Sequence, residues 1–179
     1  MLNTPNILSI IRLCLVPVFV TVYFSRLPNA ALLAVLIYAL ATFTDYLDGH
    51  LARKYNLITN LGKVLDPLGD KMLTTAVLFC LTIDDVIPIW IVLIVAAKEL
   101  LMGIGGLVIH RKAKVEIPPS NYIGKTATVL FFVVCVILML FKVGRTLSLI
   151  LICTAVAVSL AAFVSYLKRF AGIMKKEEQ

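Results

Sequence analysis

Long apolar segments are the feature that most restricts the fold of this chain. The longest approach the roughly 20 residues that an α-helix needs to cross a hydrocarbon core about 30 Å thick. Hydrophobic residues make up 61% of the 179 residues, and the mean hydropathy is +1.01, well outside the range of soluble globular proteins. Lipid offers no partner to unpaired backbone groups, so helices are the expected spanning form. The sequence therefore predicts an all-α integral membrane protein.

Six apolar segments are predicted to span the membrane. They cover residues 7–24, 30–48, 70–83, 86–109, 126–141 and 147–167. We find no repeat and no low-complexity linker between them, so the sequence predicts a single membrane domain over residues 1–179. The opening MLNTPN has no basic residue, and Arg12 interrupts the first apolar run. We therefore expect the first span to remain as an anchor and not to be cleaved as a signal peptide.

The basic residues predict the orientation of the chain. They total 17 against 10 acidic residues, a net charge of +7. Most of those outside the spans fall on alternate connections: after the second span, after the fourth and after the sixth. By the positive-inside rule, both termini and the two basic connections are predicted to be cytoplasmic. Topology and attraction to anionic lipid headgroups account for this charge, and nucleic acid is not an expected partner.

Four of the ten acidic residues gather between the second and third predicted spans: Asp45, Asp48, Asp66 and Asp70. Positions 45, 48, 49 and 52 follow the spacing of one helix face, and positions 62, 66 and 70 that of another. A short connection between them would produce an antiparallel helix pair. Two carboxylates from each helix could then meet near the cytoplasmic membrane surface.

These carboxylates need partners. Each unpaired aspartate at the centre of a membrane helix costs about 2.5–3.5 kcal/mol on insertion scales. Arg53 and Lys71 cannot neutralise four carboxylates, whereas hard divalent cations can, and Mg²⁺ retains waters that a phosphate can replace. Gly49, Ala52 and Gly62 share the same helix faces and leave room for a ligand close to the backbone. The stretch therefore predicts a metal and ligand site.

Two other interpretations of the aspartates remain open at this point. They could cap helix ends and face water, although four acids at helical spacing with glycine, alanine and arginine between them make this the weaker explanation. They could instead line the ion path of an ion-coupled transporter. That hypothesis explains the acids, but it gives no reason for the interleaved residues or for their position at the cytoplasmic end.

The same stretch resembles the signature of the CDP-alcohol phosphotransferases, D-x2-D-G-x2-A-R-x8-G-x3-D-x3-D. All eight specified residues are present over residues 45–70, and the segment NTPNILSIIR resembles the opening of members that transfer phosphatidyl groups. The resemblance implies a core of six transmembrane helices. It also implies an enzyme of the cytoplasmic membrane, with its active site facing the cytoplasm. Such an enzyme passes the phosphatidyl group of CDP-diacylglycerol to an alcohol and releases CMP.

The resemblance further implies roles for single residues. Asp45, Asp48 and Asp66 would hold Mg²⁺ or Mn²⁺ in a two-metal site, and Asp70 would contact the second ion and act as the general base. The residues implied to receive the cytidine diphosphate are Asp48, Gly49, Ala52, Arg53 and Gly62. Metal on the diphosphate would neutralise charge on the leaving group, while a carboxylate removes the proton of the acceptor hydroxyl. Homodimers are common in the family, so a homodimer is a further expectation.

Three segments of the sequence indicate which alcohol accepts the phosphatidyl group. NLGKVLDPLGDK resembles the phosphatidylglycerophosphate synthases and cardiolipin synthases of the family, which use glycerol-type acceptors. The pair Lys98 and Glu99, and the segment YIGKTAT, resemble parts of the former group. Two departures are Ala127, in place of a second lysine, and Gly106, in place of an arginine.

A phosphomonoester such as glycerol 3-phosphate favours clustered basic partners. Lys98, Arg111 and Lys125 are the predicted acceptor contacts, and glycerol 3-phosphate is the preferred acceptor. Phosphatidylglycerol is the alternative, which would make the enzyme a cardiolipin synthase, because a phosphodiester needs fewer cations. Two other roles remain open: Lys98 and Glu99 could form an ion pair within the fourth span, and Lys125 could anchor the fifth span at the interface.

Overall fold

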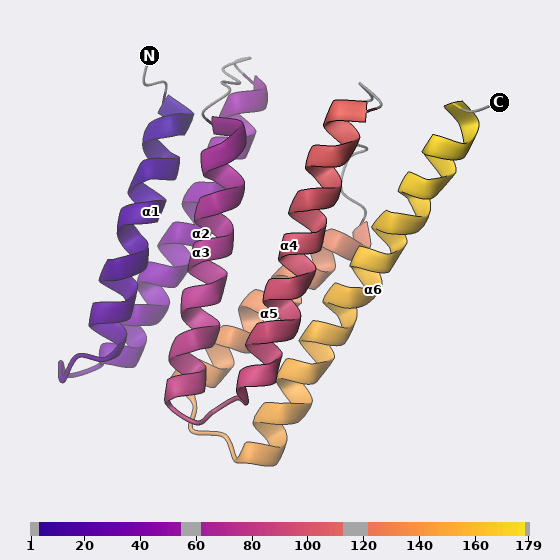
Figure 1. Ribbon diagram of the computed structural model, residues 1–179. Helices are drawn as coiled ribbons and strands as arrows, with labels where there is room; N and C mark the ends of the chain where they lie inside the picture. The colour runs from indigo at the N-terminus through magenta and orange to yellow at the C-terminus, as the bar shows by residue number, and fades with distance from the viewer. Residues whose placement is uncertain (1–3, 55–61, 113–121, 178–179) are drawn as a thin grey trace. The chain divides into compact units, whose positions relative to one another are not determined.

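The computed structural model describes residues 4–54, 62–112 and 122–177, with side chains described for residues 7–45, 69, 71–103 and 123–168. Within these ranges the chain forms six α-helices and no strand (Figure 1). They are α1 (Thr4–Tyr23), α2 (Ala30–Lys54), α3 (Gly62–Ile83), α4 (Ile89–Lys112), α5 (Tyr122–Leu140) and α6 (Arg145–Glu177). The all-α prediction is confirmed, and each predicted span overlaps one helix.

Several helix ends differ from the predicted span ends. α2 continues to Lys54, α3 begins at Gly62 and α6 continues to Glu177, because a helix does not have to end where its apolar run ends. α4 begins at Ile89, three residues later than the predicted span. The turn before it contains Asp85 at a positive φ of 55° and ends at Pro88. A proline disfavours helical backbone at the residue before it, so the helix begins after Pro88.

Two helices contain segments long and apolar enough to cross a membrane, Ile123–Leu140 and Arg145–Lys168. Three more helices carry shorter apolar segments, Ile7–Tyr23, Ala30–Asp45 and Lys71–Ile83. Fewer than a third of the residues of the two long segments are buried, and large apolar side chains such as Val129 and Ile150 are exposed. An apolar outer surface of this extent indicates contact with lipid and not with water.

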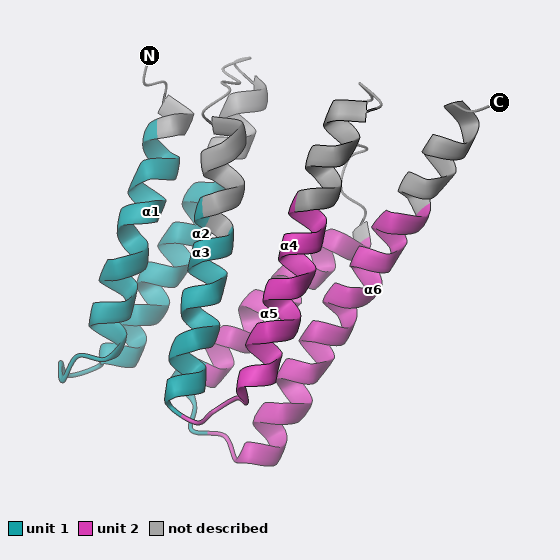
Figure 2. Ribbon diagram, viewed as in Figure 1, with its two compact units in different colours: residues 1–84, 139–142 teal, residues 85–138, 143–179 magenta. Residues whose placement is uncertain are grey.

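The chain divides into two compact units (Figure 2). Unit 1 comprises residues 1–84 and 139–142, and unit 2 comprises residues 85–138 and 143–179. Helices α1, α2 and α3 therefore belong to unit 1, while α4, α6 and most of α5 belong to unit 2. Each unit has its own packing between helices.

In unit 1, α1 packs against both α2 and α3, which also contact each other. α1 buries one stripe of side chains at helical spacing: Ser9, Arg12, Val16 and Phe19. Buried residues of α2 include Ala34, Tyr38 and Ala41, and those of α3 include Leu73, Val77 and Leu81. The ring of Phe19 on α1 lies 6.3 Å from that of Tyr38 on α2. This core holds α1 against the two helices that carry the aspartate stretch.

In unit 2, α4 packs against α6. Ile91 and Val95 are buried on α4, and Ile152 and Ala155 are buried on α6. Lys98 extends the α4 stripe by one turn, and its Nζ donates a 2.9 Å hydrogen bond to Oγ of Ser159 on α6. The contact between these two helices is therefore apolar over most of its described length and polar at Lys98.

Candidate active site

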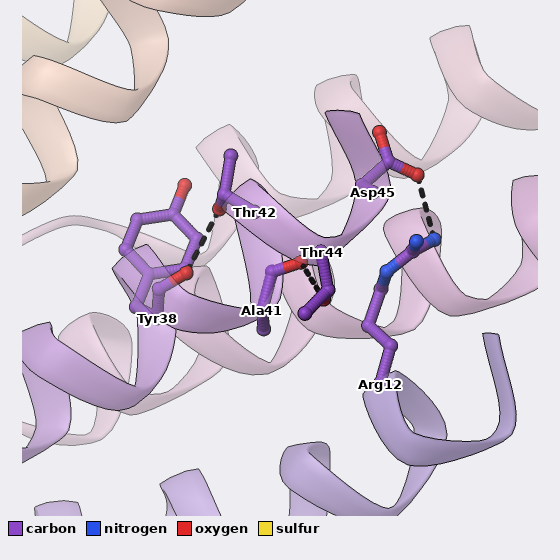
Figure 3. A network of polar contacts seen from close by, with 6 residues as sticks. All are labelled: Arg12, Tyr38, Ala41, Thr42, Thr44 and Asp45. Atoms are coloured by element: carbon purple, nitrogen blue, oxygen red, sulfur yellow. Dashed lines mark hydrogen bonds and ion pairs between the residues drawn. The ribbon is translucent and has the colours of Figure 1, made fainter. Parts of the chain in front are cut away.

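A buried ion pair joins α1 to the first aspartate of the motif. Arg12 is fully buried, and its Nη1 lies 2.6 Å from Oδ1 of Asp45 on α2 (Figure 3). A guanidinium withdrawn from water needs an anionic partner, since an isolated buried charge is very costly. Asp45 is that partner. The pair also explains how an arginine is accommodated inside an apolar helix.

Asp45 lies at the edge of the buried core of unit 1. It follows Tyr38 and Ala41 at helical spacing on α2, and 41% of its side chain is exposed. Figure 3 shows one carboxylate oxygen directed at Arg12 and the other directed away from it. The hydroxyls of Thr42 and Thr44 donate to backbone carbonyls of their own helix, at 2.9 Å and 2.7 Å. Both hydroxyl protons near the Asp45 carboxylate are thus used in hydrogen bonds to the α2 backbone.

Helix α3 completes the surroundings of Arg12. Gly69 is buried, and a Cβ at this position would lie 3.4 Å from Cδ and 3.6 Å from Nη1 of Arg12. The aliphatic stem of Arg12 therefore crosses α3 at the one residue of that turn without a side chain. Arg12 comes from α1, Asp45 from α2 and Gly69 from α3, so all three helices of unit 1 meet at this guanidinium.

The remaining motif residues fall on the predicted helices. Residues 48, 49, 52 and 53 belong to α2, and residues 62, 66 and 70 belong to α3, which confirms both helical assignments. The packing of α2 against α3 is also confirmed. The side chains of Asp48, Ala52, Arg53, Asp66 and Asp70 lie outside the described residues, as do the surroundings of Gly49 and Gly62. The convergence of the four carboxylates therefore stays a prediction.

Asp45 is the predicted metal ligand whose side chain the structure describes. In that described part of the chain, no group of three histidine, cysteine, aspartate or glutamate side chains could hold a metal ion. A metal site that includes Asp45 would therefore need further ligands from the motif residues whose side chains are not described. Asp45 itself offers a hard carboxylate oxygen, the donor type that Mg²⁺ prefers.

The predicted acceptor residues have different surroundings. Nζ of Lys98 lies 2.5 Å from Oε1 of Glu99 and bonds Ser159 as well, with 13% of the lysine side chain exposed and 22% of the glutamate. The ion pair proposed as the alternative role is thus present. Lys125 is exposed in the first turn of α5. Arg111 belongs to α4, but its side chain lies outside the described residues.

Arg12 is the residue of this region whose role sequence reasoning did not identify. Its sequence position served only as an argument against a cleaved signal peptide. Two signals were available: a charge inside a membrane segment needs a partner, and Arg12 shares the helical spacing of Ser9, Val16 and Phe19. Together they place the guanidinium on the packed face of α1.

Comparison with known proteins gives a consistent result. The sequence model of the CDP-alcohol phosphatidyltransferase family matches residues 2–164. A protein of Rickettsia bellii named CDP-diacylglycerol–glycerol-3-phosphate 3-phosphatidyltransferase is 34% identical over 170 residues, 94% of this chain and 92% of the relative. A protein of the same name from Bacillus subtilis is 34% identical over 140 residues, 72% of each chain.

One relative carries a different name. A protein of Streptomyces coelicolor named cardiolipin synthase (CMP-forming) is 39% identical over 132 residues, which are 71% of this chain and 60% of the relative. Both acceptor types considered from the sequence thus occur among the names of similar proteins.

Proposed function

The chain belongs to the CDP-alcohol phosphatidyltransferase family, and on this premise we propose that it transfers the phosphatidyl group of CDP-diacylglycerol to glycerol 3-phosphate and releases CMP. The observation that carries the acceptor assignment is the end-to-end similarity to relatives named for that reaction. One of them aligns over 94% of this chain and 92% of its own length. Because the family is one of enzymes, the transporter hypothesis is not retained.

Phosphatidylglycerol is the second candidate acceptor, and one structural observation favours it. Lys98 is engaged by Glu99 and Ser159, so its charge is largely neutralised within unit 2. A phosphomonoester would then have to rely on Arg111 and Lys125 among the predicted contacts. A phosphodiester headgroup makes a smaller demand on cationic partners. The similarity to the Streptomyces coelicolor protein supports the same alternative, although it covers only 60% of that relative.

The proposed site uses the aspartate motif. The half-exposed carboxylate of Asp45 fits a hard cation, and Asp48, Asp66 and Asp70 would supply the other ligands of a Mg²⁺ or Mn²⁺ pair. Bound there, the cations would neutralise negative charge on the diphosphate. Gly49, Ala52, Arg53 and Gly62 would seat the nucleotide together with Asp48, and Arg53 offers a fork of donors suited to phosphate.

Asp70 is proposed as the general base. It would accept the proton of the acceptor hydroxyl as that oxygen attacks the phosphorus of the phosphatidyl group, while the bond to CMP breaks. Most of the rate enhancement would then come from holding the two substrates in line and stabilising charge.

The proposed enzyme crosses the cell membrane six times, with both termini and the site on the cytoplasmic side. The two long apolar segments of α5 and α6, the shorter ones of α1 to α3 and the basic connections support this topology. The acyl chains of CDP-diacylglycerol would stay in lipid while its nucleotide stays in water. A homodimer remains part of the proposal.

The test is product identification. The purified full-length protein, in detergent micelles with CDP-diacylglycerol and Mn²⁺, is offered glycerol 3-phosphate, phosphatidylglycerol or inositol phosphate in parallel, and products are identified by mass spectrometry. We expect CMP and phosphatidylglycerophosphate in the first reaction. CMP release with phosphatidylglycerol alone would establish the second candidate. If no acceptor gives CMP release, the proposed function is wrong.

A further inference from the structure

We propose that a groove between α1 and α3 binds one acyl chain of an anionic phospholipid of the cytoplasmic leaflet. The groove has a volume of about 530 Å³ and lies within unit 1. Val16 and Val20 line it from α1, and Ala76, Phe79 and Ile83 line it from α3. None of its described lining residues belongs to the aspartate motif. The inference therefore uses the membrane topology proposed above but does not depend on the proposed reaction.

The groove is apolar and open to its surroundings. Apart from Lys71 and Thr75, its lining residues are apolar, and Phe24, Phe79 and Ile83 are exposed at its rim. Both helices carry apolar segments, Ile7–Tyr23 and Lys71–Ile83. In lipid, close packing drives association, and a groove between two helices lets one hydrocarbon chain contact both of them. An acyl chain is thus the occupant that the membrane itself supplies.

The length of the groove matches one acyl chain. Its α3 wall runs from Met72 to Ile83, which at about 1.5 Å per residue is about 16 Å. The chains of one leaflet cover half of a hydrocarbon core about 30 Å thick, which is about 15 Å. A single chain can therefore fill the groove from one end to the other.

Charge indicates which end receives the headgroup. Lys71 lines the groove at the end nearest the start of α3, whereas Phe24 and Ile83 lie at the opposite end, and none of the described lining residues is acidic. Lys71 also has an interaction within the protein, but its ammonium carries three donors and can serve a phosphate as well. In the proposed topology this end is cytoplasmic, so the headgroup belongs to the cytoplasmic leaflet.

The groove is separate from the candidate active site. By helical spacing, positions 66 and 70 continue the buried stripe of α3 that contains Leu73 and Val77. Positions 72, 79 and 83 lie on the opposite side of the helix at about 100° per residue. A lipid in the groove is therefore a bound component of the protein and not the CDP-diacylglycerol that the motif would receive.

The experiment uses phospholipids with brominated acyl chains, which quench tryptophan fluorescence at short range. Trp90→Phe removes the one tryptophan of the chain, and Phe79→Trp then places a probe at the rim of the groove. The full-length protein is reconstituted in phosphatidylcholine vesicles with increasing fractions of brominated phosphatidylserine. Val18→Trp in the same Trp90→Phe background is the matched control, because Val18 is exposed on α1 outside the groove. We expect half-maximal quenching at Phe79→Trp to need about fivefold less brominated lipid than at Val18→Trp, the attraction of about one lysine for an anionic lipid.

A second pair of variants tests the groove itself. Ala76→Phe should fill it and remove the preference for phosphatidylserine at Phe79→Trp, whereas Ala157→Phe makes the same change at an exposed alanine of α6 and should preserve the preference. Equal quenching curves at Phe79→Trp and Val18→Trp would refute the proposal, and this comparison decides the question if Ala76→Phe does not fold. Absence of quenching at Phe79→Trp would show that a second copy or another protein covers the groove, which also refutes it.

The chain without a probe provides an independent measurement. In detergent micelles, phosphatidylserine should raise the Tm of the wild type more than phosphatidylcholine does, because a ligand of the folded form stabilises it. Lys71→Met should remove this difference between the two lipids. An unchanged difference in Lys71→Met would overturn the placement of the headgroup. None of these measurements uses CMP release, so failure of the proposed reaction would be seen separately.

Discussion

The hydroxyl of Tyr23, at the end of α1, donates a 2.8 Å hydrogen bond to Oδ2 of Asp84, the residue that follows α3. The Tyr23 ring also lies 5.9 Å from the ring of Phe19, inside the core of unit 1. At the other end of the buried stripe, Arg12 pairs with Asp45 of α2. α1 is therefore joined by polar contacts to α3 at one end and to α2 at the other, with apolar packing between them.

This arrangement predicts a modest loss of stability in Tyr23→Phe. The ring contacts remain and only the hydroxyl is lost, so the free energy of unfolding should fall by about 0.5–1.5 kcal/mol, the usual contribution of one hydrogen bond. Thermal unfolding of the purified protein in micelles measures this change. Asp84→Asn retains an acceptor oxygen and should lose less than Tyr23→Phe. A larger loss in Asp84→Asn would show that the charge of Asp84 matters more than its hydrogen bond to Tyr23.

The helices could be predicted because their signals are local. Apolar runs indicated each helix, and the intervals between the motif residues placed them on α2 and α3 with no knowledge of tertiary structure. The antiparallel packing of those two helices followed from the short connection between them. The limits of α6 did not follow, because the helix continues through polar residues after its apolar segment ends.

The partners of Arg12 and Lys98 could not be predicted, because these contacts are not local in the sequence. Ser159 follows Lys98 by 61 residues, and Asp45 follows Arg12 across a turn and most of a helix. Which side chains meet depends on how each helix is rotated about its axis and how far it slides along its neighbour. Local sequence patterns restrict the rotation of a helix but say little about its position along its neighbour. The two pairs can therefore be identified only in the packed structure.

Asp70→Asn should abolish turnover while nucleotide binding is partly retained. The variant loses the proposed base, but the three other metal-binding aspartates remain to hold the diphosphate. CMP release measures turnover, and calorimetric titration with CDP-diacylglycerol measures binding. Asp85→Asn is the matched control, because Asp85 is exposed in the turn after α3 at a φ of 55° that asparagine also adopts readily. Substantial activity in Asp70→Asn would exclude its role as base.

Lys98 and Glu99 should depend on each other for stability. Lys98→Met leaves the glutamate with 22% of its side chain exposed and no lysine beside it, so we expect a loss of about 1–3 kcal/mol in the free energy of unfolding. The double variant Lys98→Met/Glu99→Gln removes both charges and should recover most of that loss. A double-mutant cycle from unfolding in micelles gives the coupling energy. If Lys98→Met instead raises the KM for glycerol 3-phosphate at unchanged stability, Lys98 is an acceptor contact.

Lys125 is the acceptor contact that can be tested most directly, because it is exposed in the first turn of α5 and its removal should not disturb packing. Lys125→Ala should raise the KM for glycerol 3-phosphate about three- to tenfold, the equivalent of roughly one hydrogen bond of ordinary strength, and change the KM for CDP-diacylglycerol less. Lys142→Ala removes an exposed lysine beyond the other end of α5 and should leave both constants unchanged. Initial rates of CMP release with each substrate varied in turn provide the measurement. Equal increases in both KM values would indicate that Lys125 anchors the helix at the membrane interface and does not contact the acceptor.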